Sequence, residues 1–170
     1  MSEYIYTECQ DQVLLLQITY EKTLNCLNNE ILEEMSDIVY KFSRNPDQRV
    51  LIVTGIGRSF CTGADLKAFS ELSQEGCVDY CMDYEEDIFH ILSSSRKVTI
   101  AAVNGYALGG GMELALACDF RIGTKWSQFG APEYGFGWVP GWGGVHRLGQ
   151  LVGNAKAKEL LLMQQKVRGE

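Results

Sequence analysis

The stretch IAAVNGYALGGGMELALACDFRIGT, residues 100–124, decides the fold class. It begins inside an apolar run, VTIAAV at 98–103, which is typical of a buried strand. Three consecutive glycines, 109–111, then precede a short apolar helix predicted over 111–118. FRIGT at 120–124 reads as the next short strand. A buried strand, a glycine turn, a helix and another strand indicate α/β structure with mainly parallel sheets.

The remaining chain repeats this alternation. Further strands are predicted at 4–8, 13–18, 49–54 and 127–130, and further helices at about 30–44, 66–73, 78–93, 143–151 and 154–166. Asn28 or Asn29 is a plausible cap for the helix over 30–44. The helix over 78–93 is expected to bury Val78, Met82, Ile88 and Leu92. Because no linker or repeat interrupts the pattern, residues 1–170 are expected to form a single domain.

Composition excludes several classes of protein. The 170 residues are 46% hydrophobic, with 15 basic and 22 acidic residues and a net charge of −7. This acidity, without a basic cluster, argues against nucleic-acid binding. No apolar stretch reaches the roughly 18 residues of a membrane span, so no membrane partner is expected. The N-terminus, MSEYIYTE, resembles neither a signal nor a transit peptide. The six cysteines are therefore expected to be reduced in the cytoplasm.

Cofactor and nucleophile motifs are absent. The sequence contains no GxxxxGK[ST], GxGxxG or GxSxG, so it predicts no phosphate-binding loop, dinucleotide site or serine nucleophile elbow. Cys77 and Cys81 lie four residues apart and could in principle bind a metal. Two thiols make only half a zinc site, and no histidine lies at ligand spacing, so ordinary packing is the favoured interpretation.

Two glycine-containing loops follow buried strands and precede helices. One is SFCTGAD at 59–65, and the other contains the three glycines at 109–111. In parallel sheets such loops meet at the carboxyl ends of the strands, where ligands bind. Glycines at a helix N-terminus allow a ligand oxygen to approach backbone N–H groups, which suits a developing oxyanion. Close strand–helix packing would require the same small residues, and the glycines alone do not separate these interpretations.

Two glutamates accompany these loops. Glu113 lies in the apolar run MELALACDF, where a buried carboxylate is costly, so either a helix-dipole interaction or a functional role is needed to explain it. Glu133 lies in the loop GAPEYGFG, and considered alone it could simply be a solvated acid. Together the two carboxyls could activate a water and deliver a proton, provided that burial raises their pKa values.

At these residues the sequence resembles the enoyl-CoA hydratase/isomerase (crotonase) superfamily, and an enoyl-CoA hydratase most of all. The similarity is carried by residues 100–148, by RVLIVTGIGRSFCTGADLKAF at 49–69 and by LNCLNNEILEEM at 24–35. It implies a spiral of ββα units that binds an acyl-CoA thioester without a metal or redox cofactor. Family members continue beyond this point with further helices, so the C-terminal helical region is expected to be missing, and the trimers or hexamers of the family depend on it.

The resemblance assigns catalytic roles by position. The N–H groups of Thr62 and Gly110 would form the oxyanion hole for the thioester carbonyl. Glu113 would activate the attacking water, Glu133 would exchange a proton with the α-carbon, and the Gly141 N–H would help to hold the water. Because hydratases retain both acids, the pair favours syn addition of water to a 2-enoyl-CoA.

The resemblance also assigns substrate contacts. Gly63, Ala64 and Asp65 fall in the loop that contacts CoA, and Cys26 falls near the adenine-binding segment. Trp138 and Trp142 are bulkier than the family's usual residues, so they would either narrow the acyl pocket or pack at a surface or interface.

Two other functions remain open. Enoyl-CoA isomerisation, acyl-CoA decarboxylation and dehydration of a carrier-bound acyl chain use the same oxyanion hole. A non-catalytic acyl-CoA-binding or scaffold protein could also keep the fold, although both glutamates are present.

Overall fold

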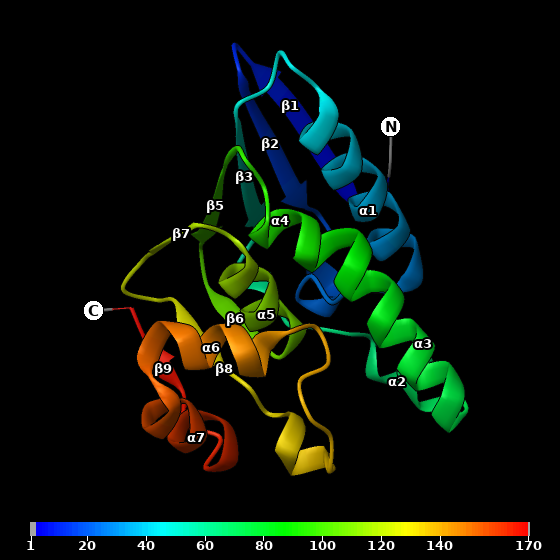
Figure 1. Ribbon diagram of the computed structural model, residues 1–170, viewed down its shortest axis with the longest axis vertical. Coiled ribbons are helices and arrows are strands. Elements are labelled where there is room, and N and C mark those ends of the chain that lie inside the picture. The colour runs from blue at the N-terminus through cyan, green and yellow to red at the C-terminus, as the bar shows by residue number, and fades with distance from the viewer. Residues whose placement is uncertain (1–2, 170) are drawn as a thin grey trace.

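The computed structural model describes residues 3–169, which form an α/β structure with two sheets (Figure 1). The larger sheet has the strand order β1-β2-β3-β5-β7, and the smaller has the order β4-β6-β8-β9. The strands are β1 (Ile5–Gln10), β2 (Val13–Ile18), β3 (Val50–Gly55), β4 (Ser59–Cys61), β5 (Val98–Val103), β6 (Tyr106–Leu108), β7 (Phe120–Gly123), β8 (Gln128–Gly130) and β9 (Val167–Arg168).

Parallel pairing dominates both sheets, as predicted. The pairs β2–β3, β3–β5, β5–β7, β4–β6 and β6–β8 are parallel. Only β1–β2 and β8–β9, among the ladders of residues 3–169, are antiparallel. The strands β4, β6 and β9 were not predicted, because two or three residues seldom show an alternating pattern; of the equally short strands only β8 was predicted, at 127–130.

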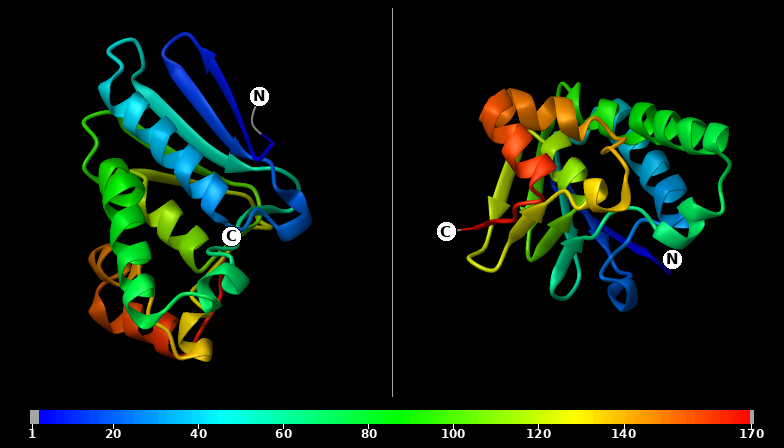
Figure 2. Two further views of the ribbon diagram at one scale, coloured as in Figure 1. Left: turned by 90° about the vertical axis from the view of Figure 1, so that its right-hand side faces the viewer. Right: turned by 90° about the horizontal axis from the view of Figure 1, so that it is seen from below.

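The helices gather on one side of the sheets (Figure 2). They are α1 (Asn29–Arg44), α2 (Leu66–Ser70), α3 (Gln74–Tyr84), α4 (Ile91–Ser93), α5 (Gly110–Ala117), α6 (Gly144–Val152) and α7 (Asn154–Leu162), with short 3-10 helices η1 (Glu21–Thr23) and η3 (Glu133–Phe136) and the π-helical turn η2 (Glu85–His90). The prediction of one helix over 154–166 was too long, since α7 ends at Leu162 and β9 follows. None of the helices in residues 3–169 is long and apolar enough to cross a membrane.

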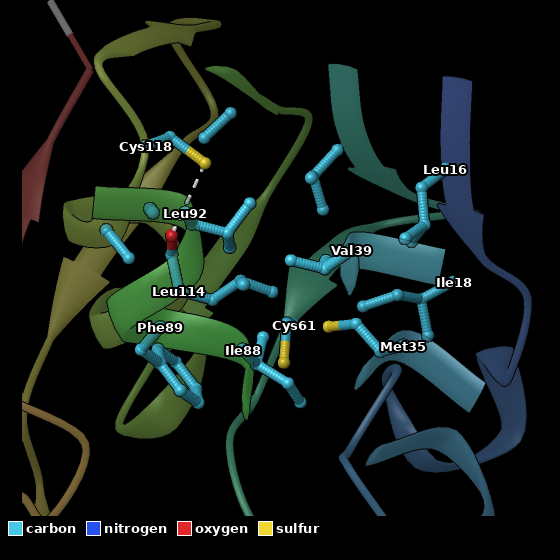
Figure 3. Packing of buried hydrophobic residues seen from close by; sticks show 14 of the residues in the cluster. Leu16, Ile18, Met35, Val39, Cys61, Ile88, Phe89, Leu92, Leu114 and Cys118 are labelled. Atoms are coloured by element: carbon cyan, nitrogen blue, oxygen red, sulfur yellow. Dashed lines mark hydrogen bonds between the residues drawn. The ribbon is translucent and has the colours of Figure 1, made fainter. Parts of the chain in front are cut away.

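The main core lies between the larger sheet and these helices. The side chain of Asn28 caps α1 by accepting a hydrogen bond from the Ile31 N–H at 2.9 Å. Side chains of α1, including Met35 and Val39, meet side chains of η2, α4 and α5 in the interior (Figure 3). A second, smaller cluster joins α5 to α6 and α7 and consists of Met112, Ala131, Leu148, Ala157, Leu160 and Leu161.

The predicted apolar face of residues 78–93 is only half correct. Ile88 and Leu92 are buried, but Val78 is 58% exposed and Met82 is 55% exposed. The inward face of α3 carries less apolar side chains, all partly buried: Cys77, Tyr80, Cys81 and Tyr84. The prediction that Val78 and Met82 face the core was wrong, because tertiary contacts decide which face of α3 is buried when its hydrophobic pattern is weak.

Close contact between α5 and β4 requires a glycine at position 111. A Cβ on Gly111 would lie 2.0 Å from the carbonyl oxygen of Cys61, well inside van der Waals contact. The backbones of β4 and α5 are therefore in direct contact, and this contact fixes the position of the first turn of α5 against β4.

We predict that Gly111→Ala lowers the free energy of unfolding by about 2 kcal/mol or more, because the new methyl group forces β4 and α5 apart. Denaturant titration measures the change. Gly149→Ala is the control: it lies within α6, and its Cβ meets only the Asn154 Oδ1 atom, at 3.1 Å. Equal stability of Gly111→Ala and the unaltered protein would contradict the close contact.

Candidate active site

Two loops meet at the start of α5. Thr62 and Gly63 follow β4, and Gly109 follows β6, immediately before α5 begins at Gly110. Because β4 and β6 are parallel neighbours, both loops leave the same edge of the smaller sheet. A Cβ on Gly63 would lie 2.8 Å from the Gly110 nitrogen, so the loops are in direct contact. The predicted convergence of the two glycine loops is thus present in the structure.

Backbone N–H groups are available where the loops meet. Gly110 is the first residue of α5, so its N–H precedes the hydrogen-bond ladder of the helix. Within residues 3–169, neither the Thr62 N–H nor the Gly110 N–H has a backbone acceptor. The Thr62 hydroxyl donates to the carbonyl oxygen of Leu24 at 3.2 Å, so the side chain is bonded to the backbone. Both N–H groups therefore suit an incoming oxyanion.

A pocket opens beside these N–H groups. Nine of the predicted site residues line it: Thr62, Gly63, Ala64, Gly110, Glu113, Glu133, Trp138, Gly141 and Trp142. The remaining lining residues are Leu66, Phe69, Tyr80, Cys81, Gly109, Pro132, Phe136 and Val139. Tyr80 and Cys81 were not predicted as site residues. The signal that could have found them is the row of partly polar residues on one face of α3, to which both belong.

Two predicted substrate contacts lie outside this pocket. Asp65 caps α2, because its Oδ1 atom accepts hydrogen bonds from the Lys67 N–H at 2.9 Å and the Ala68 N–H at 3.3 Å. Cys26 is partly buried beside the short bridge between Leu27 and Ala64. Their assignment to CoA binding remains a prediction.

Glu113 is held by the loop that leads into α6. Its side chain is buried, and its Oε1 atom accepts hydrogen bonds from the Trp142 N–H at 2.9 Å and the Gly144 N–H at 2.8 Å. Oε2 accepts no hydrogen bond from residues 3–169. The carboxyl thus binds the loop that leads into α6, while Glu113 itself lies in the first turn of α5, where the helix dipole also favours an acid.

Burial raises the pKa of Glu113 to about 8. The negative charge of Glu133 adds to the rise, and the hydrogen bonds from Gly144 and Trp142 oppose it. A carboxyl with this pKa can exchange protons near neutral pH, as general acid–base catalysis requires.

Glu133 is not a solvated loop acid. It begins η3 and is partly buried, and its Oε2 atom is buried without a hydrogen-bond partner in residues 3–169. A Cβ on Gly109 would lie 2.9 Å from the Oε1 atom of Glu133, so the carboxyl reaches the glycine loop. Burial raises the pKa of Glu133 as well. A buried, unpartnered carboxyl oxygen beside the N–H groups is suited to donate or accept a proton there.

Trp138 and Trp142, the two tryptophans predicted to be near the substrate, line the pocket, and Trp142 is also part of the core. Trp142 is only 3% exposed and stacks on Phe89, with ring centroids 5.0 Å apart. A Cβ on Gly110 would lie 2.3 Å from the Trp142 Cζ3 atom, so the indole ring covers the first residue of α5. Trp138 contacts Phe69, with ring centroids 4.6 Å apart. Trp142 therefore lines the pocket and packs in the core, and not at the surface as the alternative interpretation supposed.

Comparison with known proteins agrees with this geometry. A family model described as enoyl-CoA hydratase/isomerase matches residues 8–170. This chain belongs to the enoyl-CoA hydratase/isomerase family. Membership of this family, also called the crotonase superfamily, confirms the resemblance seen in the sequence.

Relatives of this chain include the crotonyl-CoA hydratase of Syntrophomonas wolfei, which is 41% identical over 160 residues. That alignment covers 94% of this chain and 61% of the relative. The short-chain-enoyl-CoA hydratase of Clostridium acetobutylicum is 37% identical, with 98% of this chain and 64% of the relative covered. The chain thus spans less than two thirds of the length of these relatives.

A solved structure confirms the crotonase fold. The enoyl-CoA hydratase of Bacillus anthracis superposes with a TM-score of 0.91 at 34% identity. The match covers 98% of this chain and 65% of that structure.

The raised pKa of Glu113 makes a prediction about stability. Because the folded protein holds this proton more tightly than the unfolded chain, the stability from this group is complete below about pH 4.5 and is lost as pH rises to about 8. Between pH 5 and pH 9 the free energy of unfolding should fall by on the order of 3 kcal/mol more in the unaltered protein than in Glu113→Gln. Denaturant titrations at both pH values measure the difference. The same pH dependence in both proteins would contradict the burial of a titrating carboxyl. Glu71→Gln, which changes an exposed glutamate, is the control and should keep the pH dependence of the unaltered protein.

Proposed function

We propose that this chain carries the reaction centre of an enoyl-CoA hydratase, which adds water across the C2–C3 double bond of a 2-enoyl-CoA. One observation carries the proposal: the buried carboxyl of Glu113 and the partly buried carboxyl of Glu133, both with raised pKa values, line one pocket with the unpartnered N–H groups of Thr62 and Gly110. Family membership and the named relatives support the same reaction.

The two N–H groups act on the thioester carbonyl. When a nucleophile adds to C3, the electrons of the double bond move through C2 to the carbonyl oxygen, which becomes an enolate oxygen. Hydrogen bonds from the Thr62 and Gly110 N–H groups stabilise that developing charge, and the dipole of α5 has its positive end at Gly110. The scheme uses no metal or redox cofactor, because these donors supply the electrophilic assistance.

The two glutamates transfer the protons. The ionised Glu113 takes a proton from water through Oε2 as the water oxygen bonds to C3, since Oε1 is held by the Trp142 and Gly144 N–H groups. The protonated Glu133 gives its proton to C2, which neutralises the enolate and re-forms the thioester carbonyl. Return of a proton from Glu113 to Glu133 restores the site. The Gly141 N–H, in the loop before Trp142, would help to orient the water.

The pocket walls favour a short acyl chain. Aromatic side chains of Tyr80, Trp138 and Trp142 line the same pocket as the glutamates, and the ring centroids of Tyr80 and Trp142 lie 5.9 Å apart. Rigid aromatic walls limit how far an acyl chain extends. A preference for short acyl chains agrees with the two relatives named for crotonyl-CoA and short-chain enoyl-CoA. Gly63, Ala64, Asp65 and Cys26 would contact the CoA part of the substrate.

The proposal includes the cytoplasm as the location and trimers or hexamers as the assembly. All six cysteines are free, which suits a reducing compartment. Apolar side chains on β7 are exposed, with Phe120 at 59% and Ile122 at 62%, and subunit association would cover such surfaces.

We predict that Glu133→Gln lowers the rate of crotonyl-CoA hydration by a factor of about 10² to 10⁴, because the amide cannot deliver a proton to C2. Binding of the thioester should change little, since the shape of the side chain is kept. Loss of the absorbance of the conjugated enoyl group measures the rate, and Glu71→Gln is the matched control. Unchanged turnover in Glu133→Gln would remove this residue from the mechanism. Isomerisation of a 3-enoyl-CoA without hydration would indicate another chemistry of the family.

We predict that Gly110→Pro loses about 10²-fold more activity than Gly110→Ala. Both side chains press on the Trp142 ring, whose Cζ3 atom lies 2.3 Å from an added Cβ, so the comparison cancels that clash. Only proline removes the N–H, and proline is tolerated at the first position of a helix. Steady-state hydration rates of the two folded variants measure the difference. Equal rates would show that the Gly110 N–H does not stabilise the enolate.

A further inference from the structure

An ion pair lies behind the loop that holds Glu113. Arg147, in α6, forms a two-point pair with Glu85: Nη2 lies 2.7 Å from Oε1, and Nη1 lies 3.3 Å from Oε2. The Arg147 side chain is 12% exposed and that of Glu85 is 23% exposed, so water screens the pair only in part. Neither residue lines the pocket that holds the two glutamates.

Arg147 also binds the loop itself. Its Nη1 atom donates to the carbonyl oxygen of Trp142 at 2.7 Å, and its Nη2 atom donates to the Ser93 hydroxyl at 3.2 Å. A Cβ on Gly143 would lie 2.2 Å from Nη1, so the guanidinium packs directly against the backbone between Trp142 and Gly144. Gly143 has a φ of +75°, a conformation that favours glycine.

The opposite side of the same loop holds Glu113. The N–H groups of Trp142 and Gly144 both donate to Glu113 Oε1. Residue 142 therefore connects the two groups: its carbonyl accepts from Arg147, and its N–H donates to the glutamate. A planar guanidinium holds its donors in a fixed fork, so it bonds a backbone carbonyl and a carboxylate in one defined geometry, which the single nitrogen of a lysine does not fix.

We propose that Arg147, anchored by Glu85, is a positioning residue that holds the Trp142–Gly144 backbone so that its N–H groups point at Glu113. The inference rests on the proposed function, because it gives Glu113 its catalytic geometry. Glu85 suits the role of anchor because it begins the π-helical turn η2, whose Phe89 is buried and stacks on Trp142. The ion pair thus joins η2 to α6, and the ring stack joins η2 to the loop that leads into α6.

Loss of Arg147 would act on Glu113 in two ways with the same sign. Freed N–H groups would no longer stabilise the carboxylate, and Glu85 would be left as an uncompensated negative charge. Glu85 from η2, Glu133 from η3 and the Cys81 thiol from α3 all interact with Glu113 electrostatically. Both effects make Glu113 harder to ionise.

We test the proposal with Arg147→Met in the full chain. We expect kcat for crotonyl-CoA hydration at pH 7 to fall about tenfold or more with little change in KM. The acidic limb of the pH–rate profile should move up by about one pH unit. A merely structural role would lower stability and overall rate without moving that limb. Arg147→Lys, which keeps the charge but not the fork, should show a smaller shift in the same direction.

Two further proteins keep the test decisive. If Arg147→Met does not fold, the Glu85→Gln/Arg147→Met double variant replaces it, because it leaves no unpaired charge. The acidic limb of its pH–rate profile should still lie at higher pH, because the Trp142 carbonyl has lost its donor. Lys41→Met, which breaks an exposed ion pair with Asp37 on α1, is the matched control and should leave the profile unchanged. An unmoved limb in a folded Arg147 variant overturns the proposal.

A direct titration separates this inference from the proposed function. The ¹³C shift of the Glu113 carboxyl, assigned with Glu113→Gln, reports its pKa without any turnover. A higher pKa of Glu113 in Arg147→Met than in the unaltered protein supports the positioning role, whether or not the unaltered chain hydrates crotonyl-CoA. If the unaltered chain does not hydrate crotonyl-CoA, the proposed function alone fails. Equal titration curves in the two proteins overturn the positioning role whatever the activity.

Discussion

One pair of hydrogen bonds organises the site: the Trp142 and Gly144 N–H groups donate to the buried Oε1 atom of Glu113. These bonds join α5 to the start of α6 and thereby place the loop that forms one wall of the pocket. An isolated carboxylate in this position would be very costly, and the two donors offset part of that cost. The remaining cost appears as a pKa raised to about 8, which suits the carboxyl for proton transfer.

Glycines make this arrangement possible by removing side chains from the places where backbones meet. A Cβ at position 144 would lie 2.6 Å from the Glu113 Cγ atom, and one at position 111 would lie 2.0 Å from the Cys61 carbonyl oxygen. Cys61 belongs to β4, so the glycines bring β4, α5 and α6 close enough to share one pocket. The same close approach leaves the N–H groups of Thr62 and Gly110 open to a ligand oxygen.

Much of the fold could be predicted because long elements carry strong patterns. Residues 13–18 form an almost continuous apolar run and α1 has an apolar stripe, and both were predicted close to their observed bounds. Three of the four shortest strands, β4, β6 and β9, were missed, and the C-terminal helix was predicted too long. The inward face of α3 was assigned to Val78 and Met82, because hydrophobicity alone could not show that Tyr80 and Cys81 face the pocket.

The chemistry-bearing residues of the site were visible in the sequence, since glycine runs after buried strands and acids within apolar runs are conspicuous without a structure. Glu113 and the two glycine loops could be named on that basis, whereas Glu133 in its loop could not be told from a solvated acid until the family resemblance supplied the roles of all these residues. Only the tertiary structure decided which groups touch. It paired Glu113 with the start of α6, placed Asp65 at the cap of α2, and set Arg147 against Glu85, 62 residues away in sequence. Such pairings depend on how distant elements pack, and local sequence patterns carry no record of that packing.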